Sequence, residues 1–149
     1  MAINFQLTID CTDPDRLVSF WAAALGYRPE DPPEGYATWR AYWLHVGVPA
    51  EELGAGDCND SLVDPDGIGP RIVFLPVPEG KTVKNRLHLD LKVGGGREVP
   101  LETRRHRVDA RVDQLVAAGA KRALVFDEPD ANHYHVLMHD PEGNEFDVV

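Results

Sequence analysis

Two segments of this chain repeat the same alternating pattern at an offset of 82 residues, and this repeat limits the possible folds more than any other feature. The segments are INFQLTID at 3–10 and KNRLHLDLKV at 84–93, and the offset aligns Gln6 with His88. In both segments apolar and polar residues alternate, which predicts a strand with one buried and one polar face. Gln6 and His88 fall on the polar faces. A histidine there either faces solvent beside a hydrogen-bonding neighbour or points into a polar cavity.

An amphipathic helix is predicted after each of these strands. In the first, Asp13 suits the capping position, Pro14 the first turn and Gly26 the end of the helix. A second stretch at 107–119 ends in the same way at Gly119. The apolar residues that recur at helical spacing are Leu17, Phe20, Trp21, Ala24 and Leu25, and then Val108, Val112, Leu115 and Val116.

A third repeated feature is a turn sequence, DPDG at 64–67 and DPEG at 140–143. Each of these turns precedes an extended apolar segment. Further strands are expected in each half, namely YATWRAYWLHV in the first, and RALVFDE and HYHVLMH in the second. The predicted order of elements in each half is therefore βαβββ. We expect one domain made of two repeats, 1–78 and 83–149, with a seam near 76–84.

Composition excludes several classes of function. A net charge of −10 disfavours a nucleic-acid partner, because such binding depends on Lys and Arg neutralising phosphates. No apolar run approaches the ~20 residues of a transmembrane helix, and the N-terminus shows no secretory signal. Cys11 and Cys58 are too few for a disulfide framework. These features favour a cytoplasmic protein with no membrane or nucleic-acid partner.

The ordered set of segments resembles the vicinal oxygen chelate superfamily, which includes glyoxalase I, extradiol dioxygenases and bleomycin resistance proteins. The glyoxalase-like branch is the most similar. The matching segments span nearly the whole chain: FQLTIDCTDPDRLVSFWAAALGY, DPDGIGPRIVF, KNRLHLDLKV and HVLMHDPEGNEFDVV. The resemblance implies an α+β fold in which two βαβββ modules curl a mixed sheet into a cup. It also implies a small-molecule ligand in the cup and a homodimer.

The resemblance further implies a metal site in the cup, held by residues on the first and last strands of each module. Carried over by position, the metal ligands would be Gln6, His88 and Asp147. The final strand of the first module offers only Val73 or Leu75 where the family has a glutamate. Imidazole, amide and carboxylate donors suit a divalent ion such as Zn, Ni, Fe or Mn.

Two classes of function follow from this resemblance. One is a metal-dependent lyase, isomerase or dioxygenase that acts on a small oxygenated molecule. The other is a metal-free binding protein that sequesters a drug or metabolite between Trp39, Trp43 and an acidic wall. Glu145 is a further candidate for substrate binding, whereas no catalytic residue stands out. Trp39 and Trp43 fit packing of a sheet on a helix equally well.

The sequence leaves the role of two other features undecided. His133 and His135 form an H-x-H pair, which places both side chains on one face of a strand. The pair could be a second set of metal ligands. The polar insert at 49–67 has a length that often covers a binding site.

Overall fold

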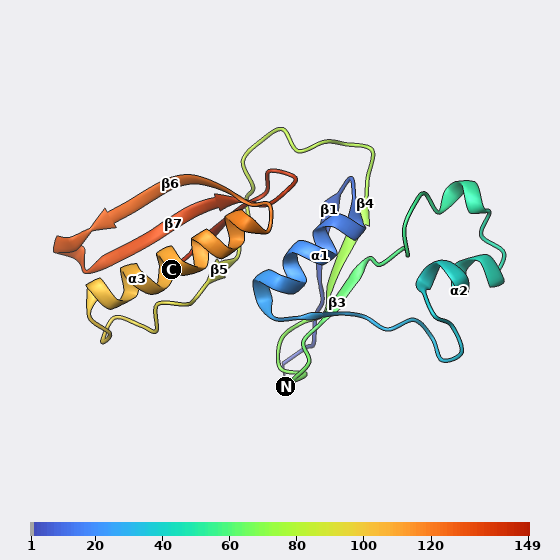
Figure 1. Cartoon of the computed structure of the whole chain (residues 1–149), viewed down its shortest axis with the longest axis horizontal. Helices are drawn as coiled ribbons and strands as arrows, with labels where there is room; N and C mark the ends of the chain where they lie inside the picture. Colours follow the sequence, from blue (N-terminus) through green and yellow to red (C-terminus); the bar gives the residue numbers. More distant parts are fainter. Residues whose placement is uncertain (1) are drawn as a thin grey trace. The chain divides into compact units, whose positions relative to one another are not determined.

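The structure is a computed structural model that describes residues 2–149. It divides into two compact units, 1–80 and 81–149, and each contains a four-stranded mixed sheet with a long helix beside it (Figure 1). The elements of the first unit are β1 (Leu7–Cys11), α1 (Pro14–Leu25), β2 (Arg28–Pro29), α2 (Trp39–His45), the short helix η1 (Ala50–Glu52), β3 (Ser61–Val63) and β4 (Ile72–Pro76).

The second unit repeats this order without a counterpart of α2. Its elements are β5 (Asp90–Leu91), α3 (Leu101–Ala117), β6 (Lys121–Glu128), the short helix η2 (Pro129–Ala131), β7 (His133–His139) and β8 (Glu145–Val148). The strand orders are β1-β4-β3-β2 and β5-β8-β7-β6. In each sheet the first and last strands of the unit pair in parallel, and the other pairs are antiparallel. The predicted α+β fold with two βαβββ modules is confirmed.

The ends of α1 are those that the sequence predicts. The Asp13 carboxylate accepts a hydrogen bond from the Arg16 backbone amide at 3.1 Å, and Pro14 occupies the first turn. Gly26 ends the helix with a φ of +72°, a left-handed conformation that favours glycine. These signals are local, so the ends of α1 can be predicted from the sequence without knowledge of tertiary contacts.

Each unit has its own apolar core between its long helix and one face of its sheet. The buried side chains of the first core include Leu17, Phe20 and Trp21 from α1, and Leu62, Ile72 and Phe74 from the sheet. Those of the second core include Val108, Val112 and Leu115 from α3, and Val136, Met138 and Phe146 from the sheet. Val116, which the helical stripe also included, is exposed. Because only one face of each sheet packs on its helix, the other face is left for polar side chains.

The segment YATWRAYWLHV is not a strand, and this prediction is wrong. Residues 39–45 form α2, which begins at Thr38, where the hydroxyl accepts a hydrogen bond from the Ala41 amide at 3.0 Å. The aromatic residues at positions 39 and 43 fit both periods, since they are four residues apart and also alternate. The threonine cap and the contact between side chains one helical turn apart favour the helix.

The predicted strand at 84–93 is also shorter than expected. Only Asp90 and Leu91 pair as β5, and Leu87, which the alternation placed on a buried face, is 82% exposed. Within 2–149, no helix combines the length and the apolar character needed to cross a bilayer.

Candidate metal site

The polar side chains of the second unit gather on the face of its sheet that points away from α3, which we call the open face. Burial alternates strictly along β7 and β8, with Val136, Met138 and Phe146 in the core. The half-buried residues between them therefore lie on the open face. They are His133, His135, Leu137 and His139 on β7, and Glu145 and Asp147 on β8.

The turn before β8 fixes the position of this strand. The buried Asp140 carboxylate accepts hydrogen bonds from the backbone amides of Glu142 and Asn144, both at 2.9 Å. Its second oxygen accepts a bond from the Asn144 side-chain amide at 3.0 Å. The predicted DPEG turn is thus a compact carboxylate-centred loop that leads directly into the strand that holds Asp147.

Three potential metal ligands converge at the edge of the open face. Asp90 of β5 lies opposite Asp147 of β8 in a parallel register. His88 Nδ1 lies 2.9 Å from an Asp90 oxygen and 3.5 Å from Asp147 Oδ2. One ligand atom from each residue falls within 4.8 Å of the others, and within 2–149 no other group of three or more His, Cys, Asp or Glu residues does so.

One oxygen of this cluster has no partner. Asp147 Oδ1 is buried and makes no hydrogen bond to any of the described residues. A buried carboxylate oxygen normally accepts a bond, because leaving it without one costs about 1–3 kcal/mol or more. The other oxygen of this carboxylate, Oδ2, is the one 3.5 Å from His88 Nδ1. A divalent cation held by the Asp147 carboxylate, the Asp90 carboxylate and the imidazole nitrogen would give this charged group a partner. One nitrogen and carboxylate oxygens form a donor set that such ions accept.

The H-x-H pair lies on the same open face but makes different contacts. His133 Nε2 and His135 Nδ1 are 2.8 Å apart, and the Phe126 ring stacks on His135 with centroids 4.3 Å apart. Burial lowers the pKa of His135, while the negative charge of Asp147 opposes this shift. The neutral imidazole is therefore favoured at neutral pH. The pair does not join the converging cluster of His88, Asp90 and Asp147.

Glu145 is engaged within its own unit. Its carboxylate accepts a hydrogen bond from the Asn85 amide at 3.0 Å and forms an ion pair with Lys81 at 3.0 Å. Burial would raise the pKa of this carboxyl, but these two contacts outweigh it and lower the pKa to about 2. Glu145 thus fastens the segment 81–85 to β8.

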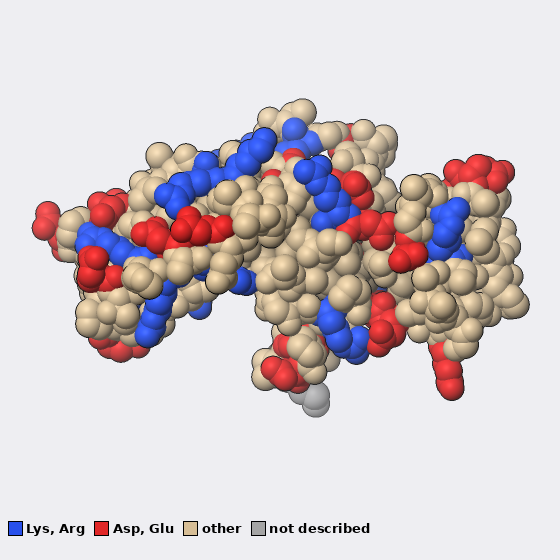
Figure 2. Space-filling model, in the orientation of Figure 1, with Lys and Arg blue, Asp and Glu red and all other residues tan. Residues whose placement is uncertain are grey.

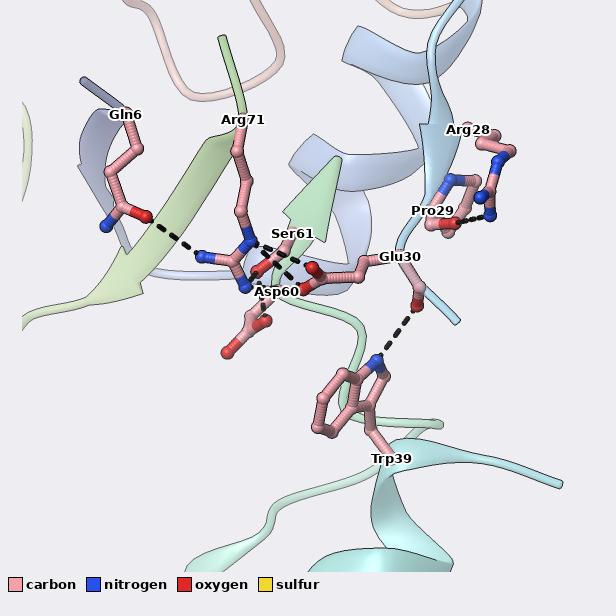
Figure 3. A network of polar contacts seen from close by, with 8 residues as sticks. All are labelled: Gln6, Arg28, Pro29, Glu30, Trp39, Asp60, Ser61 and Arg71. Atoms are coloured by element: carbon pink, nitrogen blue, oxygen red, sulfur yellow. Dashed lines mark hydrogen bonds and ion pairs between the residues drawn. The ribbon is translucent and has the colours of Figure 1, made fainter. Parts of the chain in front are cut away.

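Gln6 lies in the first unit, immediately before β1, in a network of polar contacts (Figure 3). Arg71 donates a hydrogen bond to the Gln6 amide oxygen at 3.1 Å and another to the Ser61 hydroxyl at 2.9 Å. Its guanidinium also contacts both carboxylate oxygens of Glu30, with Nε at 3.0 and 3.1 Å from them. The Trp39 indole nitrogen donates to the Glu30 carbonyl oxygen at 2.9 Å.

Register explains why the first sheet has no counterpart of the carboxylate pair. In β1 and β4, Thr8 lies opposite Val73, as Asp90 lies opposite Asp147 in β5 and β8. Valine therefore stands where the second unit has its aspartate. Sequence reasoning missed both Asp90 and Arg71, although Asp90 shares the polar face of His88 by simple alternation.

Trp39 and Trp43 lie on one side of α2, stacked with ring centroids 5.9 Å apart and an interplanar angle of 25°. This is the contact expected of residues separated by one helical turn. Both tryptophans are half-buried. They belong to the first unit, as Gln6 does, whereas His88, Asp147 and Glu145 belong to the second.

Comparison with known proteins agrees with this fold. The model of a glyoxalase-like domain family matches residues 6–149. A glyoxalase/bleomycin resistance protein/dioxygenase family enzyme from Burkholderia phytofirmans PsJN has a TM-score of 0.55 at 17% identity, and the alignment covers 96% of this chain and 94% of that one. The fosfomycin resistance protein FosX from Listeria monocytogenes has a TM-score of 0.60 at 8% identity, with 99% and 92% covered.

A variant of the Listeria protein was solved with Mn(II) and 1S,2S-dihydroxypropylphosphonic acid. It aligns with a TM-score of 0.59 at 9% identity over 99% of this chain and 91% of that one. At such identities the likeness concerns the fold alone. A search of curated proteins gave no match.

Proposed function

The chain belongs to the glyoxalase-like domain family, and from this premise we propose that it binds a divalent metal ion on the open face of its second sheet and uses that site to hold a small oxygenated molecule. The proposed ligands are His88, Asp90 and Asp147. The observation that supports this most is the convergence of one ligand atom each from His88, Asp90 and Asp147 to within 4.8 Å. The Asp147 carboxylate also has a buried oxygen, Oδ1, that accepts no hydrogen bond from the described residues. Gln6, the further ligand expected from the family resemblance, stays a prediction.

The chemistry of the ligands favours zinc, nickel, iron or manganese over magnesium. The cluster contains one nitrogen donor, and its carboxylates lie on adjacent strands with their register fixed by backbone hydrogen bonds. When bound there, a divalent ion would act as a Lewis acid that stabilises negative charge developing on a substrate oxygen. Such stabilisation suits a lyase, an isomerase or a dioxygenase.

The residues around the proposed metal ligands differ in whether they could accept a proton from a substrate. Glu145 is unsuited to accept a proton, because its contacts with Asn85 and Lys81 hold the carboxylate ionised, with a pKa of about 2. His135 is better suited, since it lies on the same face and burial favours its neutral form. We assign it the role of candidate proton acceptor.

Titration of the chain with divalent ions tests the proposal. Protein stripped with EDTA should bind one equivalent of Zn, Ni, Mn or Fe per chain in isothermal titration calorimetry. Elemental analysis after dialysis should give the same stoichiometry. Retention of far less than one equivalent of all four metals would contradict the proposal.

A second candidate function is a metal-free binding protein that sequesters a small molecule. The observation in its favour is Val73, which stands in the position of the family's second carboxylate. In this case polar side chains of the first unit, such as Arg71, would bind the ligand, with no metal required. Ligand binding that is unchanged by EDTA would favour this candidate over the metal-dependent one.

We also propose that the chain forms a homodimer, as proteins of this fold commonly do and because two-fold dimers are the most frequent oligomers. Light scattering at micromolar concentration should then give twice the mass of one chain. The mass of a single chain would contradict it.

A further inference from the structure

The first unit contains a cavity of about 550 Å³, and one of its lining residues, Asp60, also belongs to the polar network around Arg71 shown in Figure 3. It lies between the start of α1, helix α2 and the segment 48–60. Two kinds of group in its lining determine what it can bind. These are the Trp43 indole and the carboxylates of Asp13, Asp15, Glu52 and Asp60.

Polar contacts hold the walls of this cavity in place. The Asn59 amide donates to the Asp15 carboxylate at 3.0 Å, which ties the segment 48–60 to α1. Arg40 of α2 donates to the Gly54 carbonyl oxygen at 2.6 Å, and its backbone amide donates to the Asp57 carbonyl oxygen at 3.0 Å. The Trp39 ring, which does not line the cavity, stacks on Trp43. The polar insert at 49–67, whose role the sequence left open, thus contributes one wall of this cavity.

The lining has a strong negative charge. Among the described residues that line the cavity, none is Lys, Arg or His, and the guanidinium of Arg40 described above is bonded to the Gly54 carbonyl oxygen of the wall. Asp15 and Asp60 accept hydrogen bonds from neutral groups, the Asn59 amide and the Ser61 hydroxyl. Asp60 also lies near Arg71, whose guanidinium offsets part of its charge. Glu52, at the surface of η1, is an exposed carboxylate.

The spacing of these carboxylates favours a ligand larger than a single metal ion. Within 2–149, three or more metal-ligating atoms converge to within 4.8 Å only at His88, Asp90 and Asp147. The acids of the cavity instead surround a volume that could contain several non-hydrogen atoms. An indole face attracts cations, by about 0.5–2 kcal/mol depending on desolvation. Valine and leucine side chains, Val48 and Leu53, add apolar surface.

We propose that this cavity binds a small organic cation, an amine or guanidinium on an apolar body, with the charge between Trp43 and the carboxylates. Figure 2 shows acidic side chains at the surface of the part of the first unit that contains α2 and η1. The proposal is independent of the metal site, which belongs to the other unit. It therefore holds whether or not the open face of the second sheet binds metal.

Two probes of equal size test the role of charge. Isothermal titration of the EDTA-treated full chain with 2-phenylethylamine, positively charged at pH 7.5, is compared with 2-phenylethanol, its neutral counterpart. The amine should bind at least about tenfold more tightly than the alcohol. Equal affinity for the two probes, or no binding of the amine, would overturn the proposal.

A matched pair of variants then separates a specific site from general attraction to an acidic protein. Glu51 and Glu52 are neighbours on η1, but only Glu52 lines the cavity. Glu52→Gln should weaken amine binding about three- to tenfold, and Glu51→Gln, which removes the same charge, should change it less than twofold. Trp43→Leu should weaken it by a similar factor as Glu52→Gln, with an unchanged circular dichroism spectrum. Equal weakening by the two glutamate variants would show diffuse electrostatic attraction alone and would refute the site.

Discussion

Asp90 and Asp147 lie opposite each other in the parallel pairing of β5 with β8, and His88 Nδ1 lies within 3.5 Å of an oxygen of each. Two carboxylates on neighbouring strands repel one another unless a positive charge lies between them. The first sheet has Thr8 and Val73 in the same register, so it has no such pair. The two modules share a fold but differ in chemistry at this position.

Replacing the imidazole tests the metal site directly. His88 is the nitrogen donor of the cluster, so His88→Ala should reduce bound Zn or Ni to below about a tenth of an equivalent. The fold should be retained, because the side chain is 40% exposed. Elemental analysis after dialysis measures the effect. His106→Ala on the exposed face of α3 is the control, and equal metal content in the two variants would contradict a role of His88 as a ligand.

Acid should remove a stabilising contribution of Glu145. The pKa of this carboxyl falls from its ordinary value of 4.5 to about 2 in the folded chain, because its hydrogen bond from Asn85 and its ion pair with Lys81 outweigh the effect of burial. A lowered carboxyl pKa stabilises the fold above the unfolded value, and this stabilisation is lost as the pH falls from 4.5 towards 2.

Urea unfolding of wild type and Glu145→Gln between pH 7 and pH 2.5, with EDTA present, measures this contribution. The variant should be less stable by about 1–3 kcal/mol at pH 7, and the difference should shrink steadily below pH 4.5. Glu79→Gln, at an exposed position, should show no such trend. A difference that stays constant over the whole range would mean that the charge of Glu145 contributes nothing.

The Arg71 network should depend on the shape of the guanidinium as well as on its charge. Arg71 contacts Glu30, Ser61 and Gln6 at once, which the single ammonium group of lysine cannot do. Arg71→Lys should therefore lower the free energy of unfolding by about 1–2 kcal/mol.

The matched control is Arg28→Lys, because the ion pair of Arg28 with Asp31 is well exposed and should contribute little. Glu30→Gln should have less effect in the Arg71→Lys background than in wild type, since both changes break the same contact. Additive effects would contradict a shared network.

The sequence predicted most of the fold because its signals were local or repeated. Asp13, Pro14 and Gly26 set the ends of α1 through contacts within a few residues. The family resemblance placed His88 and Asp147 on the first and last strands of the second module, and in the structure they lie 3.5 Å apart. Their role as metal ligands stays a prediction.

The remaining features depended on context that the sequence does not display. Trp39 and Trp43 satisfied strand and helix periods alike, and the cap at Thr38 decided between them. The contact of Arg71 with Glu30 joins residues 41 positions apart, so it follows only once the register of β3 and β4 is known. The cavity beside Trp43 likewise arises from segments that meet only in the folded chain.

The Asp147 oxygen without a hydrogen-bond partner predicts that one substitution at this position will weaken metal binding without lowering the stability of the metal-free chain. In metal-free protein the Asp147 carboxylate places a buried oxygen without a partner opposite the like charge of Asp90. Asp147→Asn removes that charge at nearly the same volume. The variant should be as stable as wild type, or more stable by up to about 1 kcal/mol, in urea with EDTA. Its affinity for Zn should fall at least about tenfold in calorimetry, because an amide oxygen is a weaker ligand than a carboxylate.

Asp140→Asn is the matched comparison, since Asp140 is a buried aspartate of the same segment whose oxygens are both satisfied. Oδ1 accepts from the backbone amides of Glu142 and Asn144, and Oδ2 accepts from the Asn144 side chain. This variant should lose about 1–3 kcal/mol of stability even without metal, because the substituted amide group cannot accept all of these bonds. The two aspartates lie seven positions apart, yet the same substitution should act in opposite ways. If Asp147→Asn destabilised the metal-free chain as much as Asp140→Asn and left Zn binding unchanged, Asp147 would be a structural residue and the proposed metal site would be wrong.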